Sequence, residues 1–181
     1  AMKQAGIACF GPDSYCAQLE GSKAFAKEIM GRSNVPTAAM TLVTDLERGR
    51  AVLQTAQYPV VVKADGLAQG KGVVICQNRE EAELQLQSML QDLVFGDAGS
   101  RVLIEEYLTG EEVSLLCLCD GKKAWPLPSA QDHKRAFDGD KGANTGGMGA
   151  YSPAPVLPEQ DLDRVCQTCV QPILDCMRAD G

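Results

Sequence analysis

A lysine and a glycine-rich segment lie close together in the first half of the chain. Lys63 ends the β-branched run that begins at Val60, and residues 66–72 have the sequence Gly-Leu-Ala-Gln-Gly-Lys-Gly. Glycines let backbone N–H groups approach oxyanions closely, and a lysine neutralises their charge. A charge beside a buried strand also needs a partner, which a bound triphosphate or a carboxylate such as Asp65 would supply. The pair therefore predicts phosphate binding, with an ordinary salt bridge as the alternative.

The glycine-rich segment differs from a P-loop. Only three residues separate Gly66 from Gly70, Gly72 stands where a P-loop has Ser or Thr, and the β-branched run 73–76 follows in place of a helix. We expect a hairpin whose long tip, residues 66–72, is a flap that can cover phosphates. A plain surface hairpin is the alternative, because glycine-rich turns are common.

Two acidic pairs follow further along the chain. Glu105 and Glu106 come after an apolar run, and Glu111 and Glu112 come after a Thr-Gly turn. Because neighbouring side chains of a strand point to opposite faces, only one member of each pair can face a cleft. A charged strand end and turn is the alternative interpretation.

Residues 129–155 are dense in glycine and show no convincing periodicity. A loop of this length inside a compact domain is usually functional or disordered. Lys134 and Arg135 lie in it, and the unpatterned glycine-rich segment around them favours a functional role. A solvated pair of charges is the alternative.

The elements that would position these residues mix helix and strand patterns. Ser22 is the expected N-cap of a helix that stops at Gly31, and Asn78 is the expected N-cap of a helix that runs to Phe95. The later strands have connections too short for a crossover helix, so we expect them to be antiparallel. The predicted class is α+β. The predicted helices cover residues 22–31, 45–56, 78–95 and 158–177, and the predicted strands cover 6–10, 60–63, 73–76, 102–108, 112–119 and 124–127, with a turn at Asp120-Gly121.

The composition excludes several classes of function. The chain has 181 residues, 45% of them hydrophobic, and its net charge of -7 argues against nucleic-acid binding. The longest apolar run, 113–119, is too short to cross a membrane, and no signal-peptide pattern opens the chain. The eight cysteines fit reduced thiols in the cytoplasm better than a disulfide framework. Cys166 and Cys169 form a CxxC pair with no second pair and no nearby histidine, so we expect neither zinc nor redox chemistry there.

Three further sequence blocks accompany Lys63 and the flap. They are 20–25 (Glu-Gly-Ser-Lys-Ala-Phe), 128–135 (Pro-Ser-Ala-Gln-Asp-His-Lys-Arg) and 144–151 (Asn-Thr-Gly-Gly-Met-Gly-Ala-Tyr). Lys63, the flap and residues 105–112 resemble the ATP-grasp superfamily. With the three blocks, nearly the whole chain is similar to the phosphoribosylamine-glycine ligases, also called glycinamide ribonucleotide synthetases. The flap alone is weakly specific, whereas the ordered combination is specific to this ligase family.

The resemblance implies an α+β ATP-grasp fold, in which two subdomains hold the nucleotide between them. It implies that residues 1–21 end a preceding N-terminal domain and linker. Residues 22–104 would form the first subdomain with the flap, and 105–181 would form part of the second. Further N- and C-terminal domains of the same parent polypeptide would be its partners.

The resemblance also implies roles for individual residues. Lys23 and Lys63 would reach the ATP phosphates under the flap, backbone groups around Glu105 and Leu108 would bind the adenine edge, and Glu112 would hold the ribose. A strand-end carbonyl and amide can match the adjacent donor and acceptor of adenine. The implied ATP-binding set is Lys23, Lys63, Gly66, Leu67, Ala68, Gly70, Lys71, Gly72, Glu105, Glu106, Tyr107, Leu108 and Glu112. The implied catalytic residues are Lys63, Asp132 and Lys134, and the implied substrate-binding set is Gln131, Asp132, Lys134, Asn144, Thr145, Gly146, Gly147 and Met148.

The family's reaction joins glycine to 5-phosphoribosylamine with ATP and Mg2+ or Mn2+, through glycyl phosphate, in de novo purine biosynthesis. The resemblance places the metal ligands beyond residue 181, so we expect these residues alone to be inactive or nearly so. Two alternatives stay open. One is an ATP-grasp ligase for another acid and amine, such as a carboxylase that activates bicarbonate, and the other is a non-catalytic nucleotide-binding or interaction module.

Overall fold

The computed structural model describes residues 3–68, 72–139 and 141–181 and combines helices with antiparallel strands. The helices are α1 (Gln18–Gly21), α2 (Lys23–Arg32), α3 (Leu46–Thr55), α4 (Arg79–Leu90), α5 (Glu159–Val165) and α6 (Gln171–Asp180), with the 3-10 turns η1 (Lys3–Ala5) and η2 (Gly96–Gly99) and the π-helical turn η3 (Cys166–Val170). The strands are β1 (Met40–Val43), β2 (Val60–Ala64), β3 (Val73–Cys76), β4 (Val102–Glu106), β5 (Cys117–Cys119), β6 (Ala124–Pro126), β7 (Gln131–Asp132), β8 (Arg135–Phe137), β9 (Lys141–Asn144) and β10 (Ala150–Tyr151). The predicted α+β class is confirmed.

Side-chain caps start α2, α3 and α4. Ser22, Asp45 and Asn78 each accept a hydrogen bond from the backbone N–H three residues later, which satisfies a donor that the first helical turn leaves free. The predicted helix starts are therefore confirmed. Two predicted ends are wrong: α2 continues through Gly31 to Arg32, and α4 stops at Leu90 because the chain turns into a left-handed conformation at Leu93, where φ is 50°.

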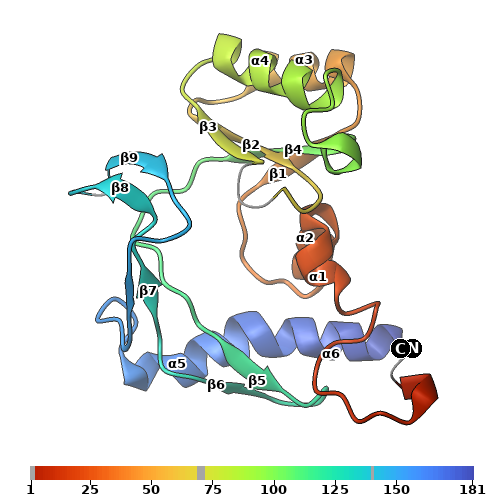
Figure 1. The fold of residues 1–181 in the computed structure, drawn as a ribbon, viewed down its shortest axis with the longest axis vertical. Helices are drawn as coiled ribbons and strands as arrows, with labels where there is room; N and C mark the ends of the chain where they lie inside the picture. The colour runs from red at the N-terminus through yellow and green to blue at the C-terminus, as the bar shows by residue number, and fades with distance from the viewer. Residues whose placement is uncertain (1–2, 69–71, 140) are drawn as a thin grey trace.

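A four-stranded antiparallel sheet, in the order β1-β4-β2-β3, forms the scaffold of the N-terminal half. Helices α3 and α4 cover one face of this sheet, and α2 lies on its other side (Figure 1). Strand alternation decides which residues meet which helices. Val60, Val62 and Ala64 of β2 belong to the core cluster under α3 and α4, together with Val102 and Ile104 of β4. The residues between them, including Lys63 and Glu105, therefore point to the α2 side.

The β2–β3 hairpin confirms the predicted pairing around the flap, whereas other strand predictions are wrong. Residues 6–10 are exposed and form no strand, because no described strand lies beside them to pair. The run 102–108 does not pair with 112–119. Its strand β4 takes the central place between β1 and β2, and β1 is absent from the sequence prediction. Of 112–119 only Cys117–Cys119 forms a strand, which pairs with β6 across the predicted turn at Asp120-Gly121.

Residues 129–155 are more regular than their sequence suggests. Strand β7 pairs with β10, and β8 pairs with β9, so four short strands replace the expected unpatterned loop. Ser129 is fully buried at the start of the segment. Its hydroxyl lies within hydrogen-bond distance of the carbonyl oxygens of Ala154 and Leu157 and accepts a hydrogen bond from the Ala154 amide. Backbone pairing, which leaves no hydrophobic period in the sequence, holds this segment together.

Helical structure runs from Glu159 to Asp180, which confirms the predicted C-terminal helix except for the π-helical turn within it. The last helix, α6, contacts α2, which lies far from it in the sequence. Asp180 of α6 accepts hydrogen bonds from Tyr15 and Arg32, both at 2.5 Å. No helix in the described ranges has the length and apolar character needed to span a membrane.

Candidate active site

A pocket of about 460 Å³ lies on the α2 side of the four-stranded sheet. Lysines from two elements line it, Lys23 and Lys27 from α2 and Lys63 from β2, together with the carboxylate of Glu105 from β4. The described ends of the flap contribute Leu67, Ala68 and Gly72. The remaining lining residues are Leu19, Glu20, Ala26, Met30 and Val73.

Lys63 and Glu105 meet because of the sheet register. Val61 lies opposite Glu105, and Lys63 follows Val61 by two residues, so Lys63 and Glu105 are diagonal neighbours on one face. The Lys63 Nζ lies 2.8 Å from Glu105 Oε2. Lys63 therefore forms the salt bridge that the alternative expected, with Glu105 rather than Asp65 as its partner.

Lys27 reaches the same carboxylate oxygen, and the sequence prediction missed it. Its Nζ lies 3.3 Å from Glu105 Oε2 and donates a 2.8 Å hydrogen bond to the carbonyl oxygen of Ala38. Lys27 follows Lys23 by four residues on α2, and this spacing places both on one helix face. This four-residue spacing is the sequence signal that could have identified Lys27 as a neighbour of Lys23.

The two adjacent glutamates point in opposite directions, as strand alternation predicts. Glu105 faces the pocket and is only 3% exposed, whereas Glu106 is exposed and accepts a hydrogen bond from the Ala39 amide. Glu105 Oε1 is buried and has no hydrogen-bond partner among the described residues. Such an orphaned oxygen is costly unless a donor reaches it.

Asp65 connects the start of α2 to the root of the flap. Its buried carboxylate accepts hydrogen bonds from the Ser22 hydroxyl and, at 2.7 Å, from the Ala24 amide. Arg101 adds an ion pair at 3.4 Å. The Nζ of Lys23 folds back onto the carbonyl oxygens of Asp65 and Gly66, at 3.3 and 3.0 Å. Asp65 thus caps α2 and holds it against the flap root.

Two flap glycines are required by packing. A Cβ on Gly66 would lie 2.7 Å from the Cβ of Ala98, and a Cβ on Gly72 would lie 2.7 Å from the Cβ of Ala68. The flap root therefore sits directly on η2. Gly70 and Lys71, which the resemblance assigns to ATP, lie outside the described residues.

Apart from Glu105, the residues expected at the adenine and ribose do not line this pocket. Tyr107 and Leu108 follow β4 and are exposed. Glu112 is further along, with a side chain that is 76% exposed and 3.0 Å from the Nζ of Lys134. The structure therefore brings together Lys23, Lys63, Leu67, Ala68, Gly72 and Glu105 and leaves Glu106, Tyr107, Leu108 and Glu112 outside the pocket lining; Gly66 lies at its root.

The residues expected on the substrate side form a second group, held by the short strands. Tyr151 donates a hydrogen bond to the side chain of Gln131, and Met148 donates one from its amide to the His133 carbonyl at 2.7 Å. Thr145 bonds the Lys134 carbonyl through both its amide and its hydroxyl. The structure thus brings the sequence blocks 128–135 and 144–151 side by side. The predicted residues of this group are Gln131, Asp132, Lys134, Asn144, Thr145, Gly146, Gly147 and Met148.

Lys134 is the charged centre of this second group. It lies 3.0 Å from Glu112 and 3.8 Å from Asp132. The hydrogen bond to Glu112 raises the pKa of the Lys134 ammonium above its ordinary value. Lys134 is thus paired with a carboxylate, but its side chain is 48% exposed, so the alternative of a solvated charge is not overturned.

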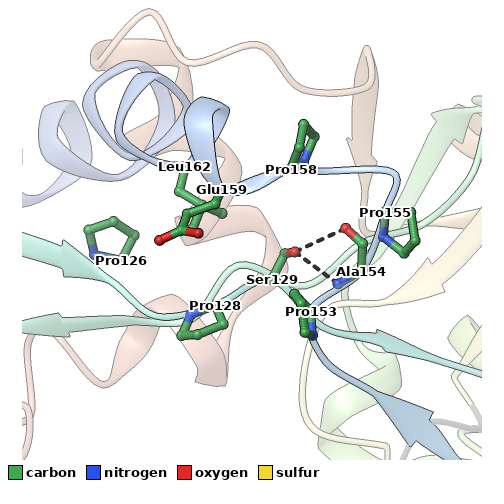
Figure 2. A pocket seen from close by; sticks show the side chains of 9 residues that line it. All are labelled: Pro126, Pro128, Ser129, Pro153, Ala154, Pro155, Pro158, Glu159 and Leu162. Carbon is green, nitrogen blue, oxygen red and sulfur yellow. Dashed lines mark hydrogen bonds between the residues drawn. The ribbon is translucent and has the colours of Figure 1, made fainter.

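A second pocket, of about 420 Å³, lies between the segment 126–129 and the start of α5 (Figure 2). Five prolines line it with Ser129, Ala154, Glu159 and Leu162. Glu159 is its one ionisable lining residue, and Ser129 is committed to the backbone of Ala154 (Figure 2). This pocket lacks cations for a phosphorylated ligand.

The thiols and carboxylates of the described residues gather no metal site. Across residues 3–68, 72–139 and 141–181, no three His, Cys, Asp or Glu side chains are placed to hold a metal ion. Each of the eight cysteines is a free thiol. Burial raises the pKa of the Cys117 thiol, 3.9 Å from that of Cys166, to about 12, which keeps it protonated and unreactive.

The fold and the site together define the class of protein. A structure of similar fold is the biotin carboxylase domain of Hydrogenobacter thermophilus 2-oxoglutarate carboxylase, solved with MgADP and bicarbonate; the TM-score is 0.75 at 22% identity, covering 97% of this chain and 38% of that one. The chain has the ATP-grasp fold. Residues 21–181 match the family described as "Phosphoribosylglycinamide synthetase, ATP-grasp (A) domain", and the chain belongs to that family.

Two relatives agree with this assignment. The phosphoribosylamine–glycine ligase of Streptococcus pyogenes serotype M6 is 54% identical over 177 residues, which are 98% of this chain and 42% of that protein. The crystal structure of phosphoribosylamine–glycine ligase from Thermotoga maritima has a TM-score of 0.84 at 33% identity, covering 95% of this chain and 44% of that one. This chain therefore spans less than half the length of the relatives it matches.

Proposed function

We propose that this chain carries the ATP-binding region, and part of the substrate region, of a ligase that joins glycine to 5-phosphoribosylamine. The products are glycinamide ribonucleotide, ADP and phosphate, as in de novo purine biosynthesis. The observation that carries the proposal is the pocket at the flap root, where three lysines and one buried carboxylate converge in a chain of this family. The family match and the named relatives do not favour another acid and amine, or a non-catalytic module.

The chemistry requires an activated carboxylate. In the proposed reaction an oxygen of the glycine carboxylate attacks the γ-phosphorus of ATP, ADP leaves, and glycyl phosphate forms. The amine of 5-phosphoribosylamine then attacks the acyl carbon, phosphate leaves, and the amide remains after loss of a proton. The protein's part is positioning and charge neutralisation. Lys23 and Lys63 would neutralise the phosphates under the flap, which would keep water from the acyl phosphate.

The remaining roles are proposed on the family resemblance. Backbone groups of 105–108 would hold the adenine edge and Glu112 would hold the ribose. The blocks that contain Asp132, Lys134 and residues 144–148 would face the substrates, an arrangement supported by their proximity across β7–β10 and around Lys134. This geometry requires the halves 22–104 and 105–181 to close around the nucleotide. Residues 1–21 would belong to a preceding domain, and further domains of a longer polypeptide would complete the enzyme.

ATP would enter with Mg2+ or Mn2+, which supplies charge neutralisation between phosphate oxygens when bound. The described residues offer no group of three His, Cys, Asp or Glu side chains for a metal ion. We also propose a cytoplasmic location, which fits eight free thiols. The 181 residues alone are expected to form no glycinamide ribonucleotide, and measurable formation would contradict that expectation.

Calorimetric titration with MgATP tests the proposed site. We expect Lys63→Ala to weaken binding by about 10- to 100-fold, because a charge-assisted contact to phosphate is lost. Lys122→Ala is the matched control, since Lys122 is exposed at the turn between β5 and β6 and does not line the pocket. Equal binding by all three proteins would place ATP elsewhere, and no binding by the unmodified chain would favour an interaction module.

A further inference from the structure

We propose that Lys27 is a positioning residue of the nucleotide pocket, the resident counter-ion of Glu105 that frees Lys63 to turn toward a bound phosphate. This inference deepens the proposed function and rests on it for the identity of the ligand. Neither the family resemblance nor the sequence pattern gives Lys27 a role. It is assigned from the contacts of its ammonium group.

Two lysines share one carboxylate oxygen. Glu105 Oε2 lies 2.8 Å from the Nζ of Lys63 and 3.3 Å from the Nζ of Lys27, and the glutamate is 3% exposed. A buried carboxylate is stable only while a cation stays beside it, and removing its last partner leaves an uncompensated buried charge. A lone lysine in this position could not leave Glu105 without a large cost. With two lysines, one can leave.

The geometry distinguishes the lysine that stays from the one that moves. The side chain of Lys27 is 12% exposed, and it is also fixed by a 2.8 Å hydrogen bond to the Ala38 carbonyl. The side chain of Lys63 is 25% exposed, and Glu105 is its one hydrogen-bond partner in the described part of the chain. Lys63 also lies next to the end of β2, three residues before the flap begins at Gly66. Lys27 is thus anchored on two sides, whereas Lys63 is held by one exchangeable contact.

This arrangement allows Lys63 to change its anionic partner when a ligand binds. Without ligand, both ammonium groups lie on Glu105. When phosphate oxygens enter, Lys63 exchanges one anionic partner for another, and Lys27 keeps Glu105 neutralised and in place. If Lys27 is removed, Lys63 becomes the sole counter-ion of Glu105, and its recruitment by phosphate costs the free energy of stranding a buried charge.

The first test needs no nucleotide and measures urea unfolding midpoints. Lys27→Met and Lys63→Met are made in the unmodified chain and in the Glu105→Gln background. Lys27→Met is expected to lower the midpoint more than Lys63→Met does, and Glu105→Gln is expected to remove most of the difference. Lys27→Arg, which keeps the charge, should stay close to the unmodified protein. A Lys27→Met chain that folds only with Glu105→Gln supports the proposal, and failure to fold in both backgrounds assigns Lys27 to packing and overturns it.

The second test measures MgATP affinity by calorimetry. Lys27→Met is expected to weaken binding by about tenfold or more, although Lys27 need not touch the ligand, and adding Glu105→Gln is expected to restore most of the loss. A purely structural lysine would not be rescued by neutralising Glu105. Binding by Lys27→Met at the unmodified affinity, or a loss that Glu105→Gln leaves unchanged, would overturn the inference.

The two tests separate the inference from the proposed function. If the unmodified chain binds no MgATP, the proposed site fails, whereas the unfolding cycle still decides whether Lys27 or Lys63 is the principal counter-ion. If the unmodified chain binds MgATP and the unfolding cycle gives Lys63 a larger coupling free energy to Glu105 than Lys27, the proposed function stands and the role of Lys27 is contradicted.

Discussion

The lysine pocket, lined by Lys23, Lys27 and Lys63, and the segment 131–151 hold the predicted site residues in place in two different ways. Glu105 in the pocket and Asp65 at the adjacent flap root are buried, and each binds side chains from other elements. In the segment, short strands and backbone hydrogen bonds hold exposed side chains. The pocket is therefore fixed by the core of the four-stranded sheet, while the segment is fixed by local pairing. We expect mutations to be costly in the first region and mild in the second.

The largest contrast is expected between two apolar truncations. Leu86 of α4 is fully buried against the sheet, so Leu86→Ala should cost about 3 kcal/mol of unfolding free energy through lost burial and a residual cavity. Phe137 of β8 is 71% exposed, and Phe137→Ala should cost less than about 0.5 kcal/mol. Urea unfolding at one pH measures both. Similar costs would mean that 131–151 is part of the cooperative core.

The next contrast compares two aspartates. Asp65→Ala leaves the Ala24 amide and the Ser22 hydroxyl without their acceptor, so a loss of about 2 kcal/mol is expected. Asp132→Ala removes one 3.8 Å contact to Lys134 and should change stability by less than about 0.5 kcal/mol. Thermal unfolding, with ligand-free protein, measures both changes. A loss at Asp132 as large as that at Asp65 would contradict the contrast.

A smaller effect is expected from two Gly→Ala substitutions. Gly66→Ala brings a Cβ to 2.7 Å from the Cβ and 2.9 Å from the Cα of Ala98, so the flap root must shift at a cost of about 1 to 2 kcal/mol. Gly146→Ala meets nothing within 4 Å and should be close to neutral. Gly66→Ala should also weaken MgATP binding, since Lys23 is held by the Gly66 carbonyl. Unchanged stability and affinity would show that the root tolerates a side chain.

The smallest effect is expected for the Lys134–Glu112 pair. Because both side chains are largely exposed, a double-mutant cycle should give at most about 0.5 kcal/mol, and 1 M salt should abolish it. The pKa of Lys134 is raised in the folded chain by Glu112. Its contribution is therefore fully present below the unfolded pKa of about 10.4 and is lost as the pH rises through the folded pKa. A coupling that grows as the pH rises through the alkaline range would contradict this sign.

Local patterns predicted much of the first region. Ser22 and Asn78 mark helix starts because a cap needs only its own side chain and the next turn. The β-branched runs on either side of the flap predicted the hairpin for a similarly local reason. The similarity of the flap and the later sequence blocks to a known family indicated the class of ligand.

Long-range pairing could not be predicted from these patterns. The contact between Lys63 and Glu105 joins residues 42 apart and depends on β4 entering the sheet beside β2. The sequence offered Asp65 only as an example of a carboxylate partner, and the run that forms β4 was expected beside the next apolar run, 112–119. Lys27 was missed because a lysine on a helix is ordinarily a solvated charge, and only tertiary structure shows that it is buried.

The second region was hard to predict for another reason. Strands of two to four residues, such as β7 and β10, bury too little to leave an alternating pattern, so 129–155 looked unstructured. The family blocks 128–135 and 144–151 still located the residues that meet there. Pairing of β7 with β10 brings these separate blocks together in the proposed substrate region.

Amide hydrogen exchange with and without MgATP tests the central claim most directly. If ATP binds in the lysine pocket, exchange should slow at the start of α2, at residues 63–66 and at residues 105–106, with smaller changes at 131–151. Slowing confined to 131–151, or to the proline-lined pocket beside α5, would contradict the assignment of the nucleotide to Lys23, Lys63 and Glu105.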